Sequence, residues 1–168
     1  MEKKLTHVIH NIPPQYDKNS RILILGSFPS PKSREAQFFY GHPQNRFWKV
    51  MARLYGRPDF QSIEEKRAFL IANRIAMWES IYECDIYGAS DASIRNAVPT
   101  DLGRIIECAD IVQIFTNGKA SGRVFDKYQS KALGRTSITL PSTSPANAAW
   151  SLDRLIDAWQ IVKVTAQD

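Results

Sequence analysis

Three loops of this chain combine residue types that suit ligand binding rather than packing. Each is rich in Gly, Pro, Ser and Asn, which lets the backbone approach a ligand closely. The loops are Gly26-Ser-Phe-Pro-Ser-Pro31, Thr116-Asn-Gly-Lys119 and Pro141-Ser-Thr-Ser-Pro-Ala-Asn147. Ser27 and His42 could form the nucleophile and base of an esterase-like hydrolase. The chain has neither a G-x-S-x-G elbow nor a late histidine, which disfavours that chemistry.

Short apolar runs precede these loops and predict the strands that position them. The runs cover residues 22–25, 75–78, 111–115 and 137–140, each bounded by turn or cap residues. A fifth run, at residues 6–9, favours a strand at an edge of the sheet or a loop. Helical patterns separate the strands, so the sequence predicts an α/β fold with three layers, α/β/α, around a central, mainly parallel four-stranded sheet. Ligands of such sheets bind beyond the carboxyl ends of the strands, where the three loops and Glu79-Ser80 lie.

Amphipathic segments between the strands predict five helices. Apolar residues at positions i, i+3, i+4 and i+7 predict a helix over residues 46–55. Ser62 and Glu65 form a capping-box pattern at the start of a second helix. We expect Thr100 to cap a third helix, Ser121 to precede the apolar residues of a fourth, and a fifth to begin near Leu152.

Length and composition predict one folded domain spanning residues 1–168. Of the 168 residues, 43% are hydrophobic and 11% aromatic, which excludes a disordered tail. The two cysteines cannot assemble the four-thiolate cage of a typical zinc or iron-sulfur site. No apolar run reaches the length of a membrane helix, so we expect a cytoplasmic protein with no membrane partner. The net charge of +5 is compatible with a polyanionic partner.

Two motifs, in this order, resemble those of the uracil-DNA glycosylase superfamily. The first is Gly-Ser-Phe-Pro after a strand, followed by Gly41-His-Pro-Gln-Asn-Arg-Phe-Trp-Lys-Val50, and the second is Pro141-Ser-Thr-Ser-Pro-Ala-Asn-Ala148. Within the superfamily the chain looks most like the DNA-deoxyinosine (hypoxanthine) glycosylases, and next most like the mismatch-specific uracil and thymine glycosylases. Asp91-Ala-Ser-Ile-Arg-Asn96 and Phe115-Thr-Asn-Gly-Lys119 also resemble the deoxyinosine branch, so the likeness covers most of residues 20–160.

The resemblance implies a monofunctional glycosylase that flips a deaminated base out of double-stranded DNA and hydrolyses its bond to the sugar. The base is hypoxanthine or uracil, no cofactor is needed, and we expect a monomer. Several relatives place an Asp or Asn directly before the proline of the first motif, where it orients the attacking water, but this chain has Phe28 there. In the deoxyinosine branch the resemblance assigns that role to Asn45, whose carbonyl oxygen would hold the water.

A helix N-cap is the alternative interpretation of Asn45, and spacing alone favours it. The resemblance shifts the balance to the catalytic role. It also implies that Tyr40 stacks on the flipped base, although an ordinary half-buried aromatic is the commoner case. Phe28 would then form a second apolar wall. For Asn117, a hydrogen bond to the base edge and a simple turn role are equally compatible with the sequence.

The second motif would contact DNA. Ser144 is a candidate catalytic residue in a loop that presses on the DNA backbone or fills the gap left by the flipped nucleotide, and it could also cap a helix before Ala148. The remaining candidates divide into a substrate group and a DNA group. The substrate group adds Gly26, Ser27 and His42, and the DNA group comprises Ser142, Pro145, Asn147, Lys119 and Arg46.

Two questions stay open at the level of the sequence. Glu35, the carboxylate within the first motif region, could orient Tyr40 or the water, or it could only pair with Arg34 or Lys32. A non-catalytic nucleic-acid-binding module would keep Tyr40 and the basic loops but would not need Asn45.

Overall fold

A parallel four-stranded sheet forms the centre of the molecule in the computed structural model, which describes residues 4–168. The strand order is β3-β2-β6-β7. These strands are β2 (Ile22–Gly26), β3 (Ile75–Glu79), β6 (Gln113–Asn117) and β7 (Ser137–Leu140). Every residue of β2 and β3 is buried, as expected of parallel strands covered on both faces. The predicted fold class is therefore confirmed.

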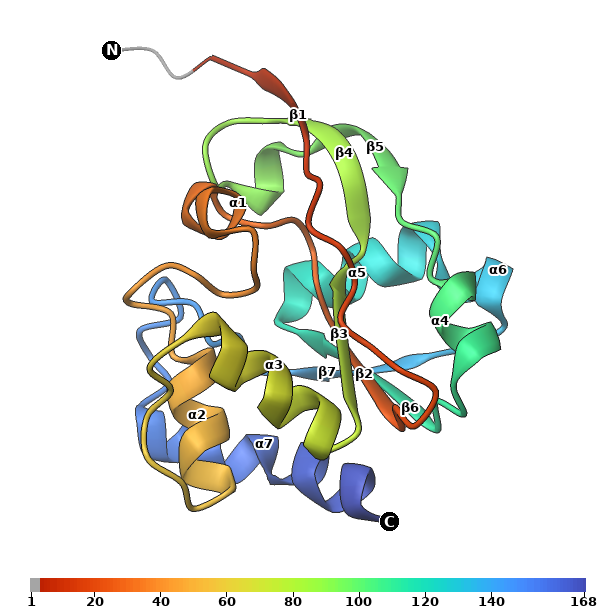
Figure 1. The fold of residues 1–168 in the computed structure, drawn as a ribbon. Coiled ribbons are helices and arrows are strands. Elements are labelled where there is room, and N and C mark those ends of the chain that lie inside the picture. Colours follow the sequence, from red (N-terminus) through yellow and green to blue (C-terminus); the bar gives the residue numbers. More distant parts are fainter. Residues whose placement is uncertain (1–3) are drawn as a thin grey trace.

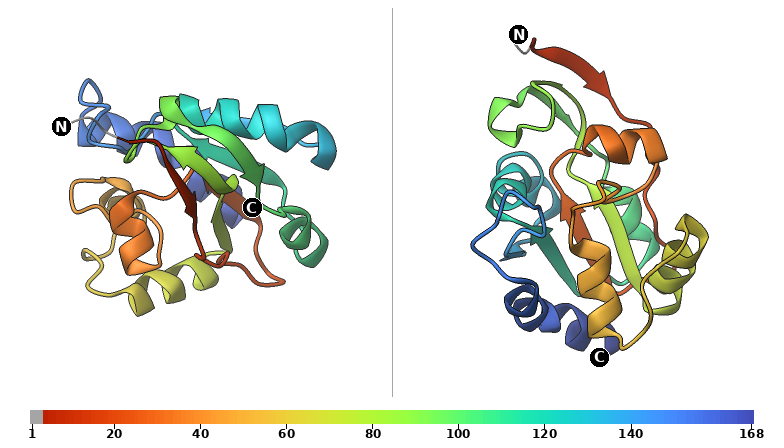
Figure 2. Two further views of the ribbon diagram at one scale, coloured as in Figure 1. Left: turned by 90° about the horizontal axis from the view of Figure 1, so that it is seen from above. Right: turned by 90° about the vertical axis from the view of Figure 1, so that its left-hand side faces the viewer.

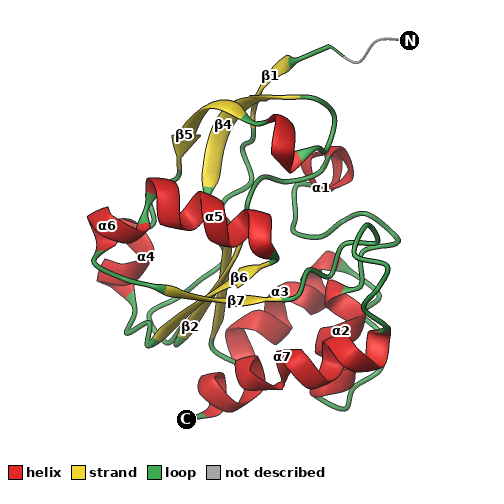
Figure 3. Cartoon of the chain, turned by 180° about the vertical axis from the view of Figure 1, so that it is seen from behind, coloured by secondary structure: helices red, strands yellow, loops and turns green. Residues whose placement is uncertain are grey.

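Helices cover both faces of this sheet (Figures 1 and 3). On one side lie α2 (Phe47–Leu54), α3 (Ile63–Ala72) and α7 (Leu152–Gln167), and on the other lie α4 (Gly103–Cys108), α5 (Lys119–Tyr128) and α6 (Ser130–Leu133). Helices α2 and α7 run side by side (Figure 2), and the rings of Phe47 and Trp159 meet edge to face with centroids 5.7 Å apart. This packing holds the start of α2, and with it Asn45, against the sheet.

A second, antiparallel sheet stands at the carboxyl end of β3. Its order is β1-β4-β5, from β1 (Thr6–Ile9), β4 (Ile81–Ile86) and β5 (Arg95–Pro99). Only Ser80 separates β3 from β4, so the small sheet continues directly from the central one. The connection from β4 to β5 contains the short helical turn η1 (Asp91–Ser93). The prediction missed five short elements: β4, η1, α6, β5, whose residues are mostly exposed, and α1 (Pro31–Ala36), which Ser30 caps.

Several predicted boundaries need correction. The third strand begins at Gln113 rather than at residue 111, because Ile111 packs into the core outside the ladder. Thr100 does not cap α4, because its hydroxyl donates to the Glu79 carbonyl at 2.7 Å. Helix α5 begins two residues before Ser121, whose hydroxyl donates to the Leu25 carbonyl at 2.8 Å. In both cases the hydroxyl donates to a carbonyl of a central strand and does not cap the neighbouring helix.

Candidate active site

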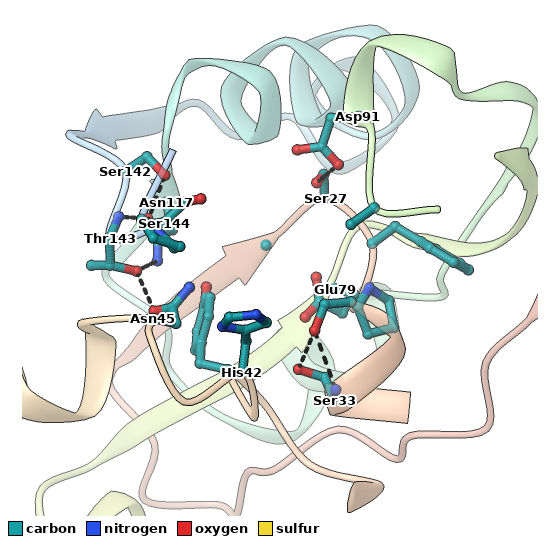
Figure 4. Close-up of a pocket in the computed structure, with 17 residues that line it drawn as sticks. Ser27, Ser33, His42, Asn45, Glu79, Asp91, Asn117, Ser142, Thr143 and Ser144 are labelled. Atoms are coloured by element: carbon teal, nitrogen blue, oxygen red, sulfur yellow. Dashed lines mark hydrogen bonds between the residues drawn. The ribbon is translucent and has the colours of Figure 1, made fainter. Parts of the chain in front are cut away.

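A cavity of about 300 Å³ opens at the carboxyl ends of the central strands, as the fold predicts (Figure 4). Its volume is at the lower end of the range for small-molecule sites, about 300–1,000 Å³. Ten of the residues proposed from the sequence line it: Gly26, Ser27, Phe28, Tyr40, His42, Asn45, Asn117, Ser142, Ser144 and Pro145. The two motifs, which lie about a hundred residues apart in the chain, are thus brought together around one cavity.

Thr143 joins the two amide side chains of the cavity wall. It is fully buried, and its backbone N–H donates to Asn117 Oδ1 at 3.0 Å. Its hydroxyl accepts from Asn117 Nδ2 at 2.9 Å and donates to Asn45 Oδ1 at 2.9 Å. The Thr143 hydroxyl is thus used both as an acceptor and as a donor, and these bonds fix the orientation of both amide side chains. Thr143 was not among the residues predicted from the sequence.

The amino group of Asn45, not its carbonyl oxygen, is available to the cavity. Asn45 Oδ1 accepts from Phe47 N at 2.9 Å as well as from Thr143, which occupies both of its lone pairs. Nδ2 has no partner within residues 4–168, and Figure 4 shows it turned towards the cavity. The bond to Phe47 supports the first turn of α2, but Asn45 is not its N-cap, because Arg46 occupies that position and makes no side-chain cap bond. An Asn45 carbonyl that holds the attacking water, as expected from the sequence, does not fit this arrangement.

The esterase-like pair does not form. Ser27 Oγ donates to Asp91 Oδ1 at 2.8 Å, so Ser27 is oriented by a carboxylate from η1 rather than by a histidine. His42 Nδ1 accepts from Gln44 N at 3.1 Å. With Nδ1 accepting, the ring carries its hydrogen on Nε2, which makes His42 a second donor on the cavity wall.

Two aromatic residues give the cavity its apolar part. Tyr40 stacks on the buried Phe47, with ring centroids 4.4 Å apart, and it holds a left-handed backbone with φ of 53°. Burial raises the pKa of the Tyr40 hydroxyl, and the negative charge that Glu79 carries above its own pKa adds to the rise, so the phenol stays neutral. Phe28 is 8% exposed and meets the buried His10 edge to face at 5.4 Å. Both rings are thus held by packing before any ligand arrives.

Three of the proposed DNA-contacting residues lie outside the cavity. Lys119 is exposed at the start of α5. Arg46 turns inward, where its guanidinium donates to the carbonyls of Ser144 at 3.0 Å, Asn147 at 3.1 Å and Trp150. Asn147 Nδ2 donates to the Ser142 carbonyl at 3.0 Å. Arg46 and Asn147 therefore hold the loop of the second motif in place. No helix begins in that loop, because α7 starts at Leu152 with Ser151 as its cap, so Ser144 caps none.

Glu35, the carboxylate considered from the sequence, is not one of the carboxyl groups that line the cavity. Glu35 is exposed and lies 3.6 Å from Lys32 Nζ, outside the cavity. Glu79 and Asp91 line the cavity instead. Glu79 is 4% exposed, and burial raises its pKa to about 8, with the negative charge of Asp91 adding to the rise. As the last residue of a buried strand, Glu79 carried a positional signal, but nothing in the local sequence separated it from a surface carboxylate.

Among residues 4–168, no three His, Cys, Asp or Glu side chains are grouped as metal ligands would be. None of the helices in the same range combines the length and the apolar character that crossing a membrane requires.

Comparisons with known proteins agree with the architecture and the motifs. Residues 13–163 match the family model of the uracil DNA glycosylase superfamily. A hypoxanthine DNA glycosylase from Methanosarcina acetivorans is 30% identical over 154 residues, which cover 89% of this chain and 94% of that protein. One from Methanosarcina barkeri is 32% identical over 140 residues, covering 80% and 85%.

A solved structure is similar in shape as well as in sequence. The solution NMR structure of a candidate uracil DNA glycosylase from Methanosarcina acetivorans has a TM-score of 0.80 and 28% identity to this chain, covering 97% of this chain and all of the other. The family match spans nearly the whole fold, including both motifs and the cavity that they line. The chain thus belongs to the uracil DNA glycosylase superfamily and is a DNA glycosylase.

Proposed function

We propose that this DNA glycosylase removes hypoxanthine, the deamination product of adenine, from double-stranded DNA. Two relatives that are about 30% identical over most of the chain are named for this activity. The cavity supports the proposal, because it combines two aromatic walls, Tyr40 and Phe28, with polar groups suited to the edge of a base. In this proposal the damaged nucleotide flips out of the helix, and its base enters the cavity.

The orientation of Asn45 carries the proposed mechanism. When the bond between base and sugar breaks, both of its electrons leave with the base, and water adds to the sugar carbon while releasing a proton. Asn45 Nδ2 and His42 Nε2 are donors on the cavity wall and would stabilise the negative charge that develops on the departing base. Because no lysine lines the cavity within residues 4–168, water is the proposed nucleophile and an intact abasic strand the product.

The loop of the second motif would hold the DNA around the flipped nucleotide. Ser142, Ser144 and Pro145 line the rim of the cavity, where we propose that they contact the sugar-phosphate backbone. Lys119 is exposed close to this rim, one residue after Gly118, which packs against Ser142. Arg46 and Asn147 act indirectly, by fixing the shape of the loop.

A panel of labelled duplexes tests the proposal. Each duplex carries deoxyinosine, deoxyuridine, a thymine mismatch or deoxyxanthosine, and hot alkali cleaves the strand wherever a base has been released. We expect faster release from deoxyinosine than from deoxyuridine, against every opposite base. Much faster release of uracil would move the protein to the mismatch-specific branch of the superfamily. Binding of deoxyinosine DNA without release of any base would favour the non-catalytic alternative.

A further inference from the structure

Glu79 is a buried carboxyl group that the mechanism above does not use. It ends β3 in the wall of the cavity (Figure 4), and the residue is only 4% exposed. The carboxyl lies against Gly26, where a Cβ atom would be 2.4 Å from Glu79 Oε2, so the glycine leaves room for the acid. Within residues 4–168, neither carboxyl oxygen has a hydrogen-bond or ion-pair partner. A buried polar group without a partner costs stability unless a ligand supplies the missing bonds.

The surroundings of Glu79 keep it in the neutral form. Besides Glu79, the titratable side chains that line the cavity are Asp91 from η1 and Tyr40 and His42 from the segment after α1. No lysine or arginine among the described residues lines it. Asp91 is held by the Ser27 hydroxyl and adds negative charge rather than positive. Burial and this negative charge raise the pKa of Glu79 to about 8. At neutral pH the group is therefore mostly a carboxylic acid with one O–H donor and one carbonyl acceptor.

We propose that Glu79 is a specificity residue that binds the amide edge of the flipped base as a neutral carboxylic acid. This inference rests on the proposed function and names the contact that would recognise the base. Hypoxanthine carries a C6=O acceptor beside an N1–H donor. The O–H of Glu79 donates to the base carbonyl, and its C=O accepts from the base N–H. The two hydrogen bonds run in parallel, as in a carboxylic acid–amide pair, and they give Glu79 the partners that the protein itself does not supply.

A general base is the role that a buried carboxylate in a hydrolase first suggests, and the two roles predict opposite results. A general base must be ionised, so activity would rise as the pH passes the pKa of Glu79, and an amide at this position would be inactive. A neutral acid that binds the base loses its donor on ionisation, so activity falls above that pH. Glutamine keeps one donor and one acceptor in nearly the same shape, and it does not titrate.

The experiment is single-turnover base release from deoxyinosine duplexes between pH 6 and pH 9, with wild-type protein, Glu79→Gln and Glu79→Ala. We expect wild-type release to fall above about pH 8, approaching tenfold per pH unit. Glu79→Gln should stay within about tenfold of wild type at pH 7 and should lack this decline, whereas Glu79→Ala should lose about 10- to 100-fold. The N1–H of the base titrates equally for all variants, so their difference isolates Glu79. Glu35→Gln, which removes an exposed carboxylate, is the control and should match wild type.

A second substrate keeps the test independent of how well the variants fold. N1-methyldeoxyinosine lacks the N–H that Glu79 would bind, so wild-type protein should release it at least about tenfold more slowly than deoxyinosine. That preference should disappear in Glu79→Ala. Wild-type activity that rises through pH 8, an inactive but folded Glu79→Gln, or equal rates on the two substrates would each overturn the proposal. If the protein releases uracil instead, the proposed function fails, but the same pH test applies, because uracil carries the same N–H and C=O pair.

Discussion

The direction of one amide decides what Asn45 can do. Its oxygen is held by Phe47 N and by the Thr143 hydroxyl, so the cavity meets an N–H donor. A donor stabilises negative charge on a departing base, whereas an acceptor orients water. The residue was predicted from the sequence, but its direction was not, because the direction depends on Thr143, which is 98 residues away in the chain.

Substituting Asn45 distinguishes the two roles. Asn45→Ala removes the donor, and we expect single-turnover base release to fall by about 10²- to 10³-fold while DNA affinity changes little. Asn45→Asp keeps the oxygen that bonds Phe47 and Thr143 but turns a second oxygen towards the cavity. If the donor matters, aspartate should be as inactive as alanine. An aspartate variant as active as wild type, or more active, would instead support a role in holding water.

Stability must be measured beside these rates, because Asn45 also supports the first turn of α2. A side-chain hydrogen bond to the backbone of this kind contributes about 0.5–1.5 kcal/mol to stability. Asn45→Asp keeps that contribution and Asn45→Ala does not. A rate loss shared by both variants therefore comes from the active site, and a rate loss that follows the melting temperature comes from the helix.

At the scale of elements, the loop of the second motif depends on the neighbouring helix α2. Arg46, just before α2, reaches across and donates to three carbonyls of the segment from Ser144 to Trp150. Arg46 N also donates to the Thr143 carbonyl at 3.0 Å. Since α2 packs against α7, the loop is held from the body of the protein and not only from its own ends. Such support is what a loop needs if it is to press on DNA without moving.

Replacing Arg46 should therefore damage the site more than it weakens DNA binding. We expect Arg46→Ala to lower stability by about 1–3 kcal/mol, because three carbonyls lose a charged donor. At a temperature where the variant is fully folded, the rate of base release should still be lower than that of wild type, so unfolding cannot account for the loss. Arg53→Ala is the matched control, as an exposed arginine in the last turn of the same helix. If Arg46→Ala mainly reduces DNA affinity and leaves the melting temperature unchanged, Arg46 contacts phosphate instead.

Elements that bury apolar runs could be predicted from the sequence, and elements defined by long-range contacts could not. The strands β2 and β3 are wholly buried, so their residues show the pattern directly. β5 is mostly exposed and exists because β4 pairs with it, which no local pattern records. The cavity walls were found through the two motifs and the strand ends, but Thr143 and Glu79 were not identified as individual site residues. Their importance comes from what lies across the cavity from them, not from their neighbours in the chain.

At the scale of the whole molecule, the net charge of +5 accompanies a DNA substrate. Exposed lysines within two residues of the cavity lining along the chain, Lys32 and Lys119, are available to phosphates, whereas Arg46 is not. Binding several phosphates releases counterions, so affinity for duplex DNA should fall at least about tenfold between 50 and 200 mM salt. Fluorescence anisotropy with an undamaged duplex measures this. An affinity that does not change over this range would mean that the exposed lysines do not bind the backbone.

The burial of Glu79 also makes folding itself a proton-binding reaction. Its pKa rises from 4.5 in the unfolded chain to about 8 in the folded one, so between these values the folded protein holds a proton that the unfolded chain has released. The stability that this proton provides is complete below about pH 4.5 and is lost as the pH rises towards 8, by at most about 1.4 kcal/mol per pH unit. Because glutamine does not titrate, the melting temperature of Glu79→Gln should gain on that of wild type between pH 5 and pH 8. A constant difference over that range would mean that Glu79 is ionised in the folded protein. If Glu79 is protonated in the folded protein, as proposed, the same proton serves base recognition and folding. Alkaline conditions that remove this proton would therefore weaken base recognition and stability together.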